Sequence, residues 1–423
     1  MEKKHSGGER PPLSDFNEAQ REAVCHREGP CMVLAGPGSG KTAVITGRLE
    51  WMIRHFRIRP EEILVITFTK YAVKEMKERF LARMGLKHCP VTFGSFHGIY
   101  YGMLRQIYHL APDQILTEEE QKAMVEAAVR DVERENRKRP KDKDVLLMIG
   151  KVKNNGGFSG ITDDPEDRQI YHAYEKRKKE AGRIDFDDML VYTYELFRER
   201  KDILSAWQRK FQYILIDEFQ DINKIQFDIV KMLAAPENNL FVVGDDDQSI
   251  YRFRGARPEI MLGFEKDYPD AKKVILNTNY RCSAEIVDSA EHLISHNTKR
   301  FPKNMQAARG KKVPITFRYL KDAGEECTDI LKGIRFYHKK GIPLEEMAVI
   351  FRTNTQPRLL VGRLMEYNIP FQMRDVIPNI FDHWIARNIL TYIKITMGNK
   401  DRKLFLKIMN RHKRYISRSM LTD

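Results

Sequence analysis

The chain has 423 residues, of which 42% are hydrophobic and 31% charged, and its formal net charge is +14. This length allows two or three domains with real cores, and a membrane protein is excluded because no run approaches the roughly 18 apolar residues of a spanning helix. The first twelve residues are polar and lack the apolar segment of a signal peptide, so we expect a soluble, cytoplasmic protein.

The chain carries 73 Lys and Arg against 59 Asp and Glu, which favours a polyanionic partner, most simply nucleic acid. Charge alone leaves this open, because many basic proteins bind no nucleic acid. The five cysteines include no C-x-x-C pair, which fits neither a zinc site nor a disulfide framework. We expect reduced and mostly buried thiols.

Five short apolar, β-branched runs are each followed directly by polar residues or glycine. They cover residues 31–35, 63–68, 213–216, 240–243 and 274–276. Such runs are typical of buried parallel strands whose carboxyl ends carry the chemistry. Residues 42–57 and 71–84 have helical character between the first runs, as βαβ units require. The pattern predicts an α/β fold with a parallel sheet.

The segment from about residue 112 to residue 181 changes character. Thr117 and Glu120 have the spacing of a helix capping box, and apolar residues then recur at helical spacing. This predicts a helical insertion. Its charged stretches, residues 133–144 and 176–179, are either a solvated surface or a DNA contact.

A second αβ pattern begins after residue 281. Strand-like runs at residues 313–319 and 347–351 flank an amphipathic helical segment at residues 327–338, which predicts a second core. From residue 381 onward the chain is helical in character and basic.

Residues 35–42 read Ala-Gly-Pro-Gly-Ser-Gly-Lys-Thr directly after the first predicted strand. In such a loop, backbone N–H groups close around a β-phosphate, Lys41 reaches the β- and γ-phosphates, and the Thr42 hydroxyl ligates Mg²⁺. A glycine-rich loop alone could be an ordinary turn. The candidate nucleotide-binding residues here are Gly36, Gly38, Ser39, Gly40, Lys41 and Thr42.

An acidic pair follows the third predicted strand, in the segment Ile-Asp-Glu-Phe-Gln-Asp at residues 216–221. Asp217 is suited to hold Mg²⁺, directly or through water, and Glu218 to orient and deprotonate an attacking water. Together with the glycine-rich loop, the pair predicts hydrolysis of a nucleoside triphosphate.

Residues 217–221 and the segment Gly-Asp-Asp-Asp-Gln-Ser-Ile-Tyr-Arg-Phe-Arg-Gly-Ala at residues 244–256 are more specific than the loop. Here the chain resembles the UvrD/Rep family of superfamily 1 DNA helicases, collinearly from about residue 13 to its end. The resemblance implies a RecA-like P-loop NTPase core with a parallel sheet, a helical insertion and a partial second RecA-like domain. The implied segments are 1–110 and 182–283 for the ATP-binding core, 111–181 for the insertion, 284–380 for the partial second domain and 381–423 for the start of a second insertion.

The resemblance also implies roles around ATP. Gln20, in Phe16-Asn-x-x-Gln20, would read the adenine, and Tyr280 would pack against it. Gln248 would sense the γ-phosphate, and Arg281 would be an arginine finger that neutralises charge developing during transfer. The implied catalytic set is Lys41, Asp217, Glu218, Gln248 and Arg281, with ATP and Mg²⁺ as cofactors.

Contacts to DNA are implied in the same way by several short segments. Thr67-Phe-Thr-Lys-Tyr-Ala72 resembles the family's first DNA motif, with Lys where Asn is usual, and Gly94-Ser-Phe-His97 resembles the next. Asp185-Phe-Asp-Asp-Met-Leu190 is expected to help line the strand path. The expected contact residues are Phe68, Thr69, Phe96, His97, Tyr251, Phe253 and Arg254, with core packing as the alternative for Phe96 and His97.

The resemblance implies an ATP-dependent DNA helicase that moves along single-stranded DNA and unwinds duplex DNA, in the 3′-to-5′ direction by resemblance alone. Two later family motifs, Ser-Lys-Gly-Leu-Glu-like and Val-Ala-x-Thr-Arg-Ala-like, have no match, so we expect a C-terminally truncated chain that hydrolyses ATP slowly. One alternative is a catalytically weak or silent DNA-binding fragment. Another is a small-molecule P-loop kinase, which would not need Gln248 next to an aromatic run.

Overall fold

The computed structural model describes residues 13–132, 140–311, 314–374, 379, 381, 383–411, 414 and 416. The chain forms two compact units, Met1–Ile315 and Thr316–Asp423. No helix in the described ranges is long and apolar enough to cross a membrane. All five cysteines are free thiols, and three of them are buried, as predicted.

The first unit is built on a six-stranded parallel sheet with the order β3-β2-β4-β5-β1-β6. The strands are β1 Cys31–Ala35, β2 Ile63–Thr67, β3 Thr92–Ser95, β4 Tyr213–Ile216, β5 Leu240–Gly244 and β6 Lys272–Leu276. Five of these strands were predicted, and the predicted parallel α/β sheet is therefore confirmed. The sixth, β3, was missed because the sequence Thr-Phe-Gly-Ser contains no β-branched apolar run.

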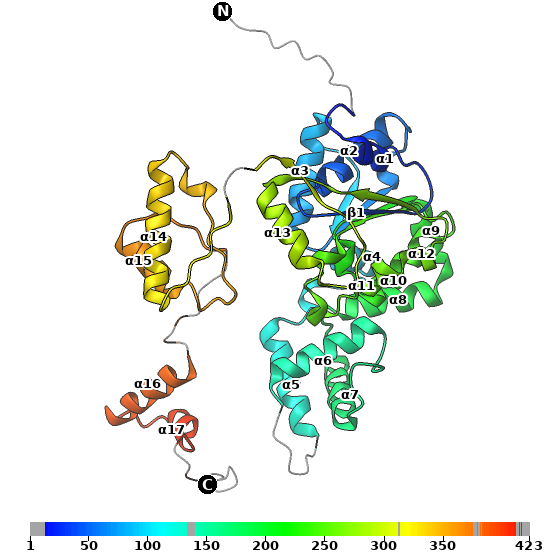
Figure 1. Ribbon diagram of the computed structural model, residues 1–423. Helices are drawn as coiled ribbons and strands as arrows, with labels where there is room; N and C mark the ends of the chain where they lie inside the picture. Colours follow the sequence, from blue (N-terminus) through cyan, green and yellow to red (C-terminus); the bar gives the residue numbers. More distant parts are fainter. Residues whose placement is uncertain are drawn as a thin grey trace, which may run out of the picture. The chain divides into compact units, whose positions relative to one another are not determined.

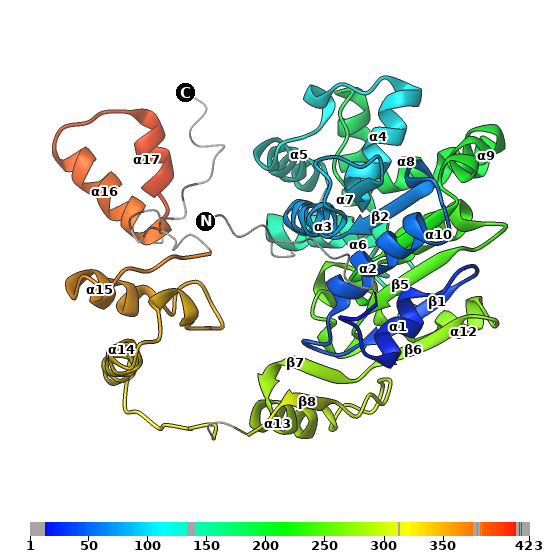
Figure 2. The same ribbon diagram turned by 90° about the horizontal axis from the view of Figure 1, so that it is seen from above.

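Helices cover both faces of the sheet, which explains why β1, β2 and β5 are buried along their whole length. Successive side chains of a strand point to opposite faces. Met32 and Leu34 therefore enter one core, and Cys31 and Val33 enter the other. Helices α4 Phe96–Tyr108, α8 Asp188–Glu199 and α10 Lys224–Ala234 contribute to the first core, and α1 Glu18–Val24, α2 Lys41–Arg54 and α3 Lys70–Met84 to the second (Figure 2).

Three helices between β3 and β4 pack around a core of their own, as predicted for the insertion (Figure 1). They are α5 Glu118–Asp131, α6 Asp142–Asn155 and α7 Pro165–Glu180. The predicted capping box is present: Thr117 Oγ1 accepts from Glu120 N, and the Glu120 carboxylate accepts from Thr117 N. Of the predicted charged stretch, residues 133–139 lie outside the described ranges.

A two-stranded parallel sheet follows the main sheet along the chain. Strand β7, Thr278–Ser283, pairs with β8, Gln306–Arg309, and α13, Ala284–Ile294, lies between them in sequence. The first unit also contains the short helices α9 Lys201–Lys210, α11 Pro258–Leu262 and α12 Phe264–Asp267.

The second unit consists of helices in the described residues, namely α14 Ala323–Lys339, α15 Arg358–Glu366, α16 Trp384–Thr396 and α17 Arg402–Ile408. Cys327, Leu331, Leu360 and Leu364 form a small core. The strands predicted at residues 313–319 and 347–351 are wrong for the described residues, because residues 314–319 and 347–351 form no ladder of hydrogen bonds with a described strand. Residue 313 lies outside the described ranges. The predicted helix lies within α14, whereas the boundaries after residues 110, 181, 283 and 380 stay predictions.

Candidate nucleotide and DNA site

The glycine-rich loop connects β1 to α2 at the carboxyl edge of the main sheet. Gly38 and Gly40 have φ angles of +66° and +87°, in the left-handed region that favours glycine. The Ser39 hydroxyl donates to the Gly36 carbonyl over 2.7 Å and closes the turn. Because α2 starts at Lys41, the free N–H groups of its first turn face the loop, an arrangement suited to a phosphate.

The acidic pair lies beside this loop, directly after β4. Lys41 Nζ donates to Glu218 Oε2 over 2.8 Å, although the two residues are 177 positions apart. Glu218 has a φ of +51°, which is uncommon for a residue with a side chain and is typical of strained functional positions. The structure therefore brings the predicted phosphate-binding ammonium and the predicted base together.

Among the residues that the structure describes, the acidic side chains beside the phosphate loop outnumber the single cation next to them, Lys41. Burial and the neighbouring Glu218 raise the pKa of Asp217 to about 7, and the same two causes raise the pKa of Asp221 to about 7. Lys41 is the cation that opposes both shifts. Carboxylate oxygens in excess over cations are a donor set that suits Mg²⁺, with Thr42 and Asp217 as the candidate ligands.

Gln220 links the acidic pair to the predicted γ-phosphate sensor and was missed as a site residue. Its amide nitrogen donates to Glu218 Oε2 over 2.8 Å, and its amide oxygen accepts from Asp245 N over 2.9 Å. The Gln248 amide in turn donates to the Asp245 carboxylate. The position of Gln220 inside the motif at residues 216–221 was the only available signal.

The predicted adenine-binding residues lie against the same loop. Tyr280 N donates to the Gly38 carbonyl over 3.0 Å, and Asn17 Nδ2 donates to the Tyr280 hydroxyl over 2.8 Å. The Gln20 amide donates to the Ser39 carbonyl over 2.9 Å and accepts from Asn17 N over 3.0 Å. The roles of Gln20 and Tyr280 toward adenine stay predictions, and Asn17 is an additional residue of the site.

The predicted arginine finger reaches the loop from β7. Asn279 Oδ1 accepts from Arg281 N over 2.8 Å, which fixes the backbone at this position. A Cβ atom added to Gly38 would lie 2.8 Å from Arg281 Cβ, so β7 packs directly on the loop. The Arg281 side chain itself is exposed.

Three of the predicted DNA-contacting residues form an exposed group in the short 3₁₀ segment Arg252–Arg254 and beside it. Tyr251 and Phe253 are 41% and 55% exposed, with ring centroids 6.2 Å apart. The Arg254 guanidinium carbon lies 5.4 Å and 5.5 Å from these rings. Exposed aromatic faces beside a cation suit unstacked bases and phosphates.

The expectation for Phe96 requires a correction. Its side chain is 1% exposed and belongs to the main core, with Phe68 packed edge-on at 5.3 Å, so the core alternative describes it. His97 is partly buried, which lowers its pKa, and its ring contacts the exposed Phe186 at 6.2 Å. Thr69 is exposed and its hydroxyl caps α3.

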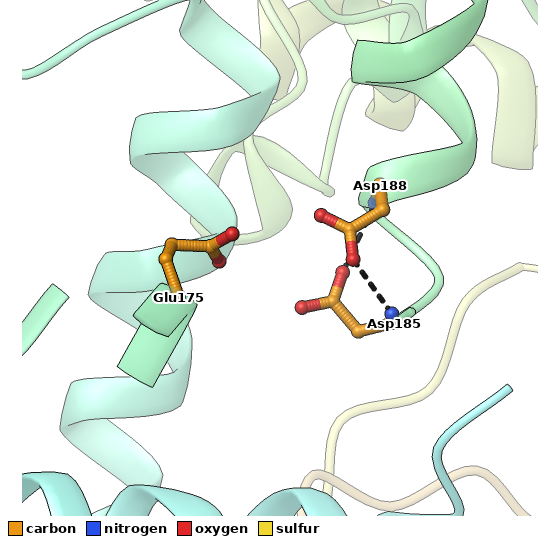
Figure 3. A group of neighbouring side chains, drawn as sticks. All are labelled: Glu175, Asp185 and Asp188. Carbon is orange, nitrogen blue, oxygen red and sulfur yellow. Dashed lines mark hydrogen bonds between the residues drawn. The ribbon is translucent and has the colours of Figure 1, made fainter. Parts of the chain in front are cut away.

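Two of the three Asp residues in the segment 185–190 do not line an open path. Asp185 and Asp188 are buried, with Glu175 beside them (Figure 3). Their oxygens are close enough for a metal, but two lysines occupy the cation positions: Lys153 Nζ lies 2.6 Å from Asp185 Oδ2, and Lys178 Nζ 2.6 Å from Asp188 Oδ2. We call these five residues the junction cluster, since they join α6 and α7 of the insertion to α8 of the core.

The comparisons with known proteins agree with this geometry. The UvrD/REP helicase N-terminal domain family matches residues 16–269, and the UvrD-like helicase C-terminal domain family matches residues 274–423. The first match includes the loop, the acidic pair and the Gln248 segment. The second includes Tyr280 and Arg281.

Several curated relatives are similar over most of the chain. YjcD of Bacillus subtilis (strain 168), whose name marks it as a provisional ATP-dependent DNA helicase, is 40% identical over 405 residues, which cover 92% of this chain and 53% of YjcD. ATP-dependent DNA helicases PcrA of Staphylococcus epidermidis and Leuconostoc citreum are each 33% identical, with 96% of this chain and 57% and 56% of the relatives covered. The chain thus spans about half the length of these relatives, and it belongs to the UvrD/REP helicase family.

Proposed function

We propose that this chain hydrolyses ATP with Mg²⁺ and uses the energy to move along single-stranded DNA, as part of a DNA helicase with 3′-to-5′ direction. The observation that carries the proposal is the contact between Lys41 and Glu218 beside the phosphate loop, with β7 packed on the same loop. A phosphate-binding ammonium, a base and an arginine within one site are the parts that phosphoryl transfer to water requires.

Each residue has a distinct task in this proposal. The N–H groups of the loop and of the first turn of α2 hold the phosphates, and Lys41 turns from Glu218 toward them. Glu218 then accepts the proton of the attacking water, and Arg281 neutralises charge on the transferred group. Bound Mg²⁺, held by Thr42 and Asp217, would supply charge neutralisation at the phosphate oxygens.

Coupling to DNA is supported by a path of hydrogen bonds that runs from the base to Gln248, a few residues before the exposed aromatic rings. Glu218 contacts Gln220, Gln220 contacts Asp245, and Asp245 contacts Gln248. Tyr251 and Phe253 follow within five residues. A change of phosphate state at Gln248 can therefore alter the position of rings that stack on bases.

The test is ATP turnover with and without single-stranded DNA, in wild type and in Glu218→Gln. We expect DNA to stimulate turnover, and Glu218→Gln to lower it about 10²- to 10⁴-fold because the base is lost. Glu78→Gln, on the exposed surface of α3, is the matched control and should have no effect. Wild-type turnover by Glu218→Gln would refute the assignment.

Three further measurements separate the alternatives. A small-molecule kinase leaves phosphate on an acceptor, whereas the proposed motor releases it to water, so product analysis distinguishes them. A silent DNA-binding fragment would bind single-stranded DNA without turnover. Strand displacement on a 3′-tailed duplex measures whether this chain, which spans about half the length of the named helicases, unwinds DNA on its own.

A further inference from the structure

The segment between α13 and β8, residues 300–305, contacts both sides of the ATP site, and none of its residues was predicted to act there. We call it the anchor segment. The Lys303 side chain is 0% exposed. Its Nζ lies 2.9 Å from Asp245 Oδ1 and 2.8 Å from Asp247 Oδ2, and it also pairs with Asp246.

Two more groups of the anchor segment bind the same three aspartates, residues 245–247, which we call the acidic run. Arg300 forms a two-pronged pair with Asp247, with both nitrogen–oxygen distances 2.8 Å. Phe301 N donates to Asp246 Oδ2 over 2.8 Å. The three carboxylates are close enough to act as metal ligands, but the Lys303 ammonium already binds all three, so the run is an attachment point for the chain.

The other end of the anchor segment lies on the phosphate loop. A Cβ atom added to Gly36 would lie 2.2 Å from Met305 Sδ, so Met305 covers this glycine. The next residue, Gln306, donates its N–H to the Asn277 carbonyl over 2.7 Å and pairs β8 with β7. The anchor segment therefore connects the run before Gln248 to the strand that carries Tyr280 and Arg281.

We propose that Lys303 and Arg300 are positioning residues that hold β7, and with it Arg281, in register with Gln248. The inference deepens the proposed function and rests on it for the roles of Arg281 and Gln248. Without Lys303, three neighbouring carboxylates would lose a buried counter-ion, and such groups separate or draw in water. The acidic run and the anchor segment would then move apart, and β7 would lose the support of β8.

The test is hydrogen exchange, read by mass spectrometry, in wild type, Lys303→Met and Lys303→Arg. In Lys303→Met we expect the amides of Tyr280 and Gln306, which bond to the loop and to residue 277, to exchange about tenfold faster or more, while β1 and β5 amides keep their protection. Lys303→Arg should recover part of the protection. Lys299→Met, in the exposed stretch just before the anchor segment, is the matched control. Unchanged exchange at both amides in Lys303→Met would overturn the proposal.

Arg300→Gln gives a second, milder variant that decides the question if Lys303→Met does not fold. It should speed exchange at the same two amides, and the absence of any change would equally refute the proposal. Where wild type turns over ATP, we expect both variants to lower kcat about tenfold or more with KM for ATP within about twofold, because misplacement by about 1 Å suffices for such losses. Absence of wild-type turnover would count against the proposed function, while the exchange data would still decide the role of the anchor segment.

Discussion

Removal of one lysine from the junction cluster should loosen the helical insertion specifically. Lys178 Nζ lies 2.6 Å from Asp188 Oδ2, 2.8 Å from Glu175 Oε1 and 3.2 Å from Asp185 Oδ2, and its side chain is 1% exposed. In Lys178→Met, three carboxylates share Lys153 as their remaining cation in the cluster. Breaking a buried ion pair from one side typically costs about 3–5 kcal/mol, a large share of the stability of one domain.

Hydrogen exchange of α6 and α7 is the assay, because it reports on the insertion without requiring the whole chain to unfold. A loss of about 3–5 kcal/mol should speed exchange of the slowest amides of these helices about 150- to 5,000-fold. Lys176→Met is the matched control: this residue lies on the same helix, is 77% exposed and contacts Glu180 at 4.0 Å. Exposed pairs contribute about 0–1 kcal/mol, so exchange should change less than about fivefold.

Charge compensation provides a check on the cause. In Lys178→Met/Glu175→Gln, one of the uncompensated carboxylates is neutral, so part of the lost protection should return. Equal exchange in Lys178→Met and Lys176→Met would show that the cluster does not hold the insertion. Equal exchange in the single and double variants would show that lost packing, and not charge, causes the effect.

Three further outcomes are expected. Burial, together with Asp185, raises the pKa of Asp187 to about 6, so the folded state favours the neutral acid and wild type loses stability as pH rises from about 4 through about 6. In urea titrations, Asp187→Asn should therefore be more stable than wild type by about 1–3 kcal/mol at pH 8 and equal to it below pH 4. Phe253→Ala should weaken single-stranded DNA binding by about 1–3 kcal/mol and duplex binding less, measured by fluorescence anisotropy, with equal losses excluding a stacking role. Gly38→Ala should reduce ATP affinity in titration calorimetry, because the new Cβ meets Arg281 at 2.8 Å, and unaltered affinity would contradict the close packing of β7.

The main sheet was predictable because β1, β2 and β5 are buried on both faces and each predicted apolar run changes abruptly to polar residues or glycine. Strand β3 was not predicted, since this edge strand, which contains Gly94, is neither fully buried nor a run of apolar residues. The opposite error occurred at residues 347–351, where β-branched residues lie outside any described strand and Ile350 is 92% exposed. A run of β-branched residues indicates a preference for extended backbone, but a strand forms only where a neighbouring strand pairs with it.

The site was predictable where its residues lie within short contiguous motifs, as do Lys41 and Glu218. Phe96 lies in such a motif as well, yet its side chain enters the core, because a motif match does not say which way a ring points. Lys303 and Met305 could not be found at all. Their importance arises from contacts to residues more than 50 positions away, and nothing in their local sequence distinguishes them from ordinary surface residues.

The strand order has a consequence for synthesis on the ribosome. Strand β1, which leads into the phosphate loop, pairs with β5 and β6 and not with β2. Its partners therefore leave the ribosome only after about 200 further residues, or roughly 10–40 s at 5–20 residues per second. Throughout this interval an apolar strand with two free edges is available to the wrong partner, so the nascent chain is exposed to mispairing until β5 has emerged.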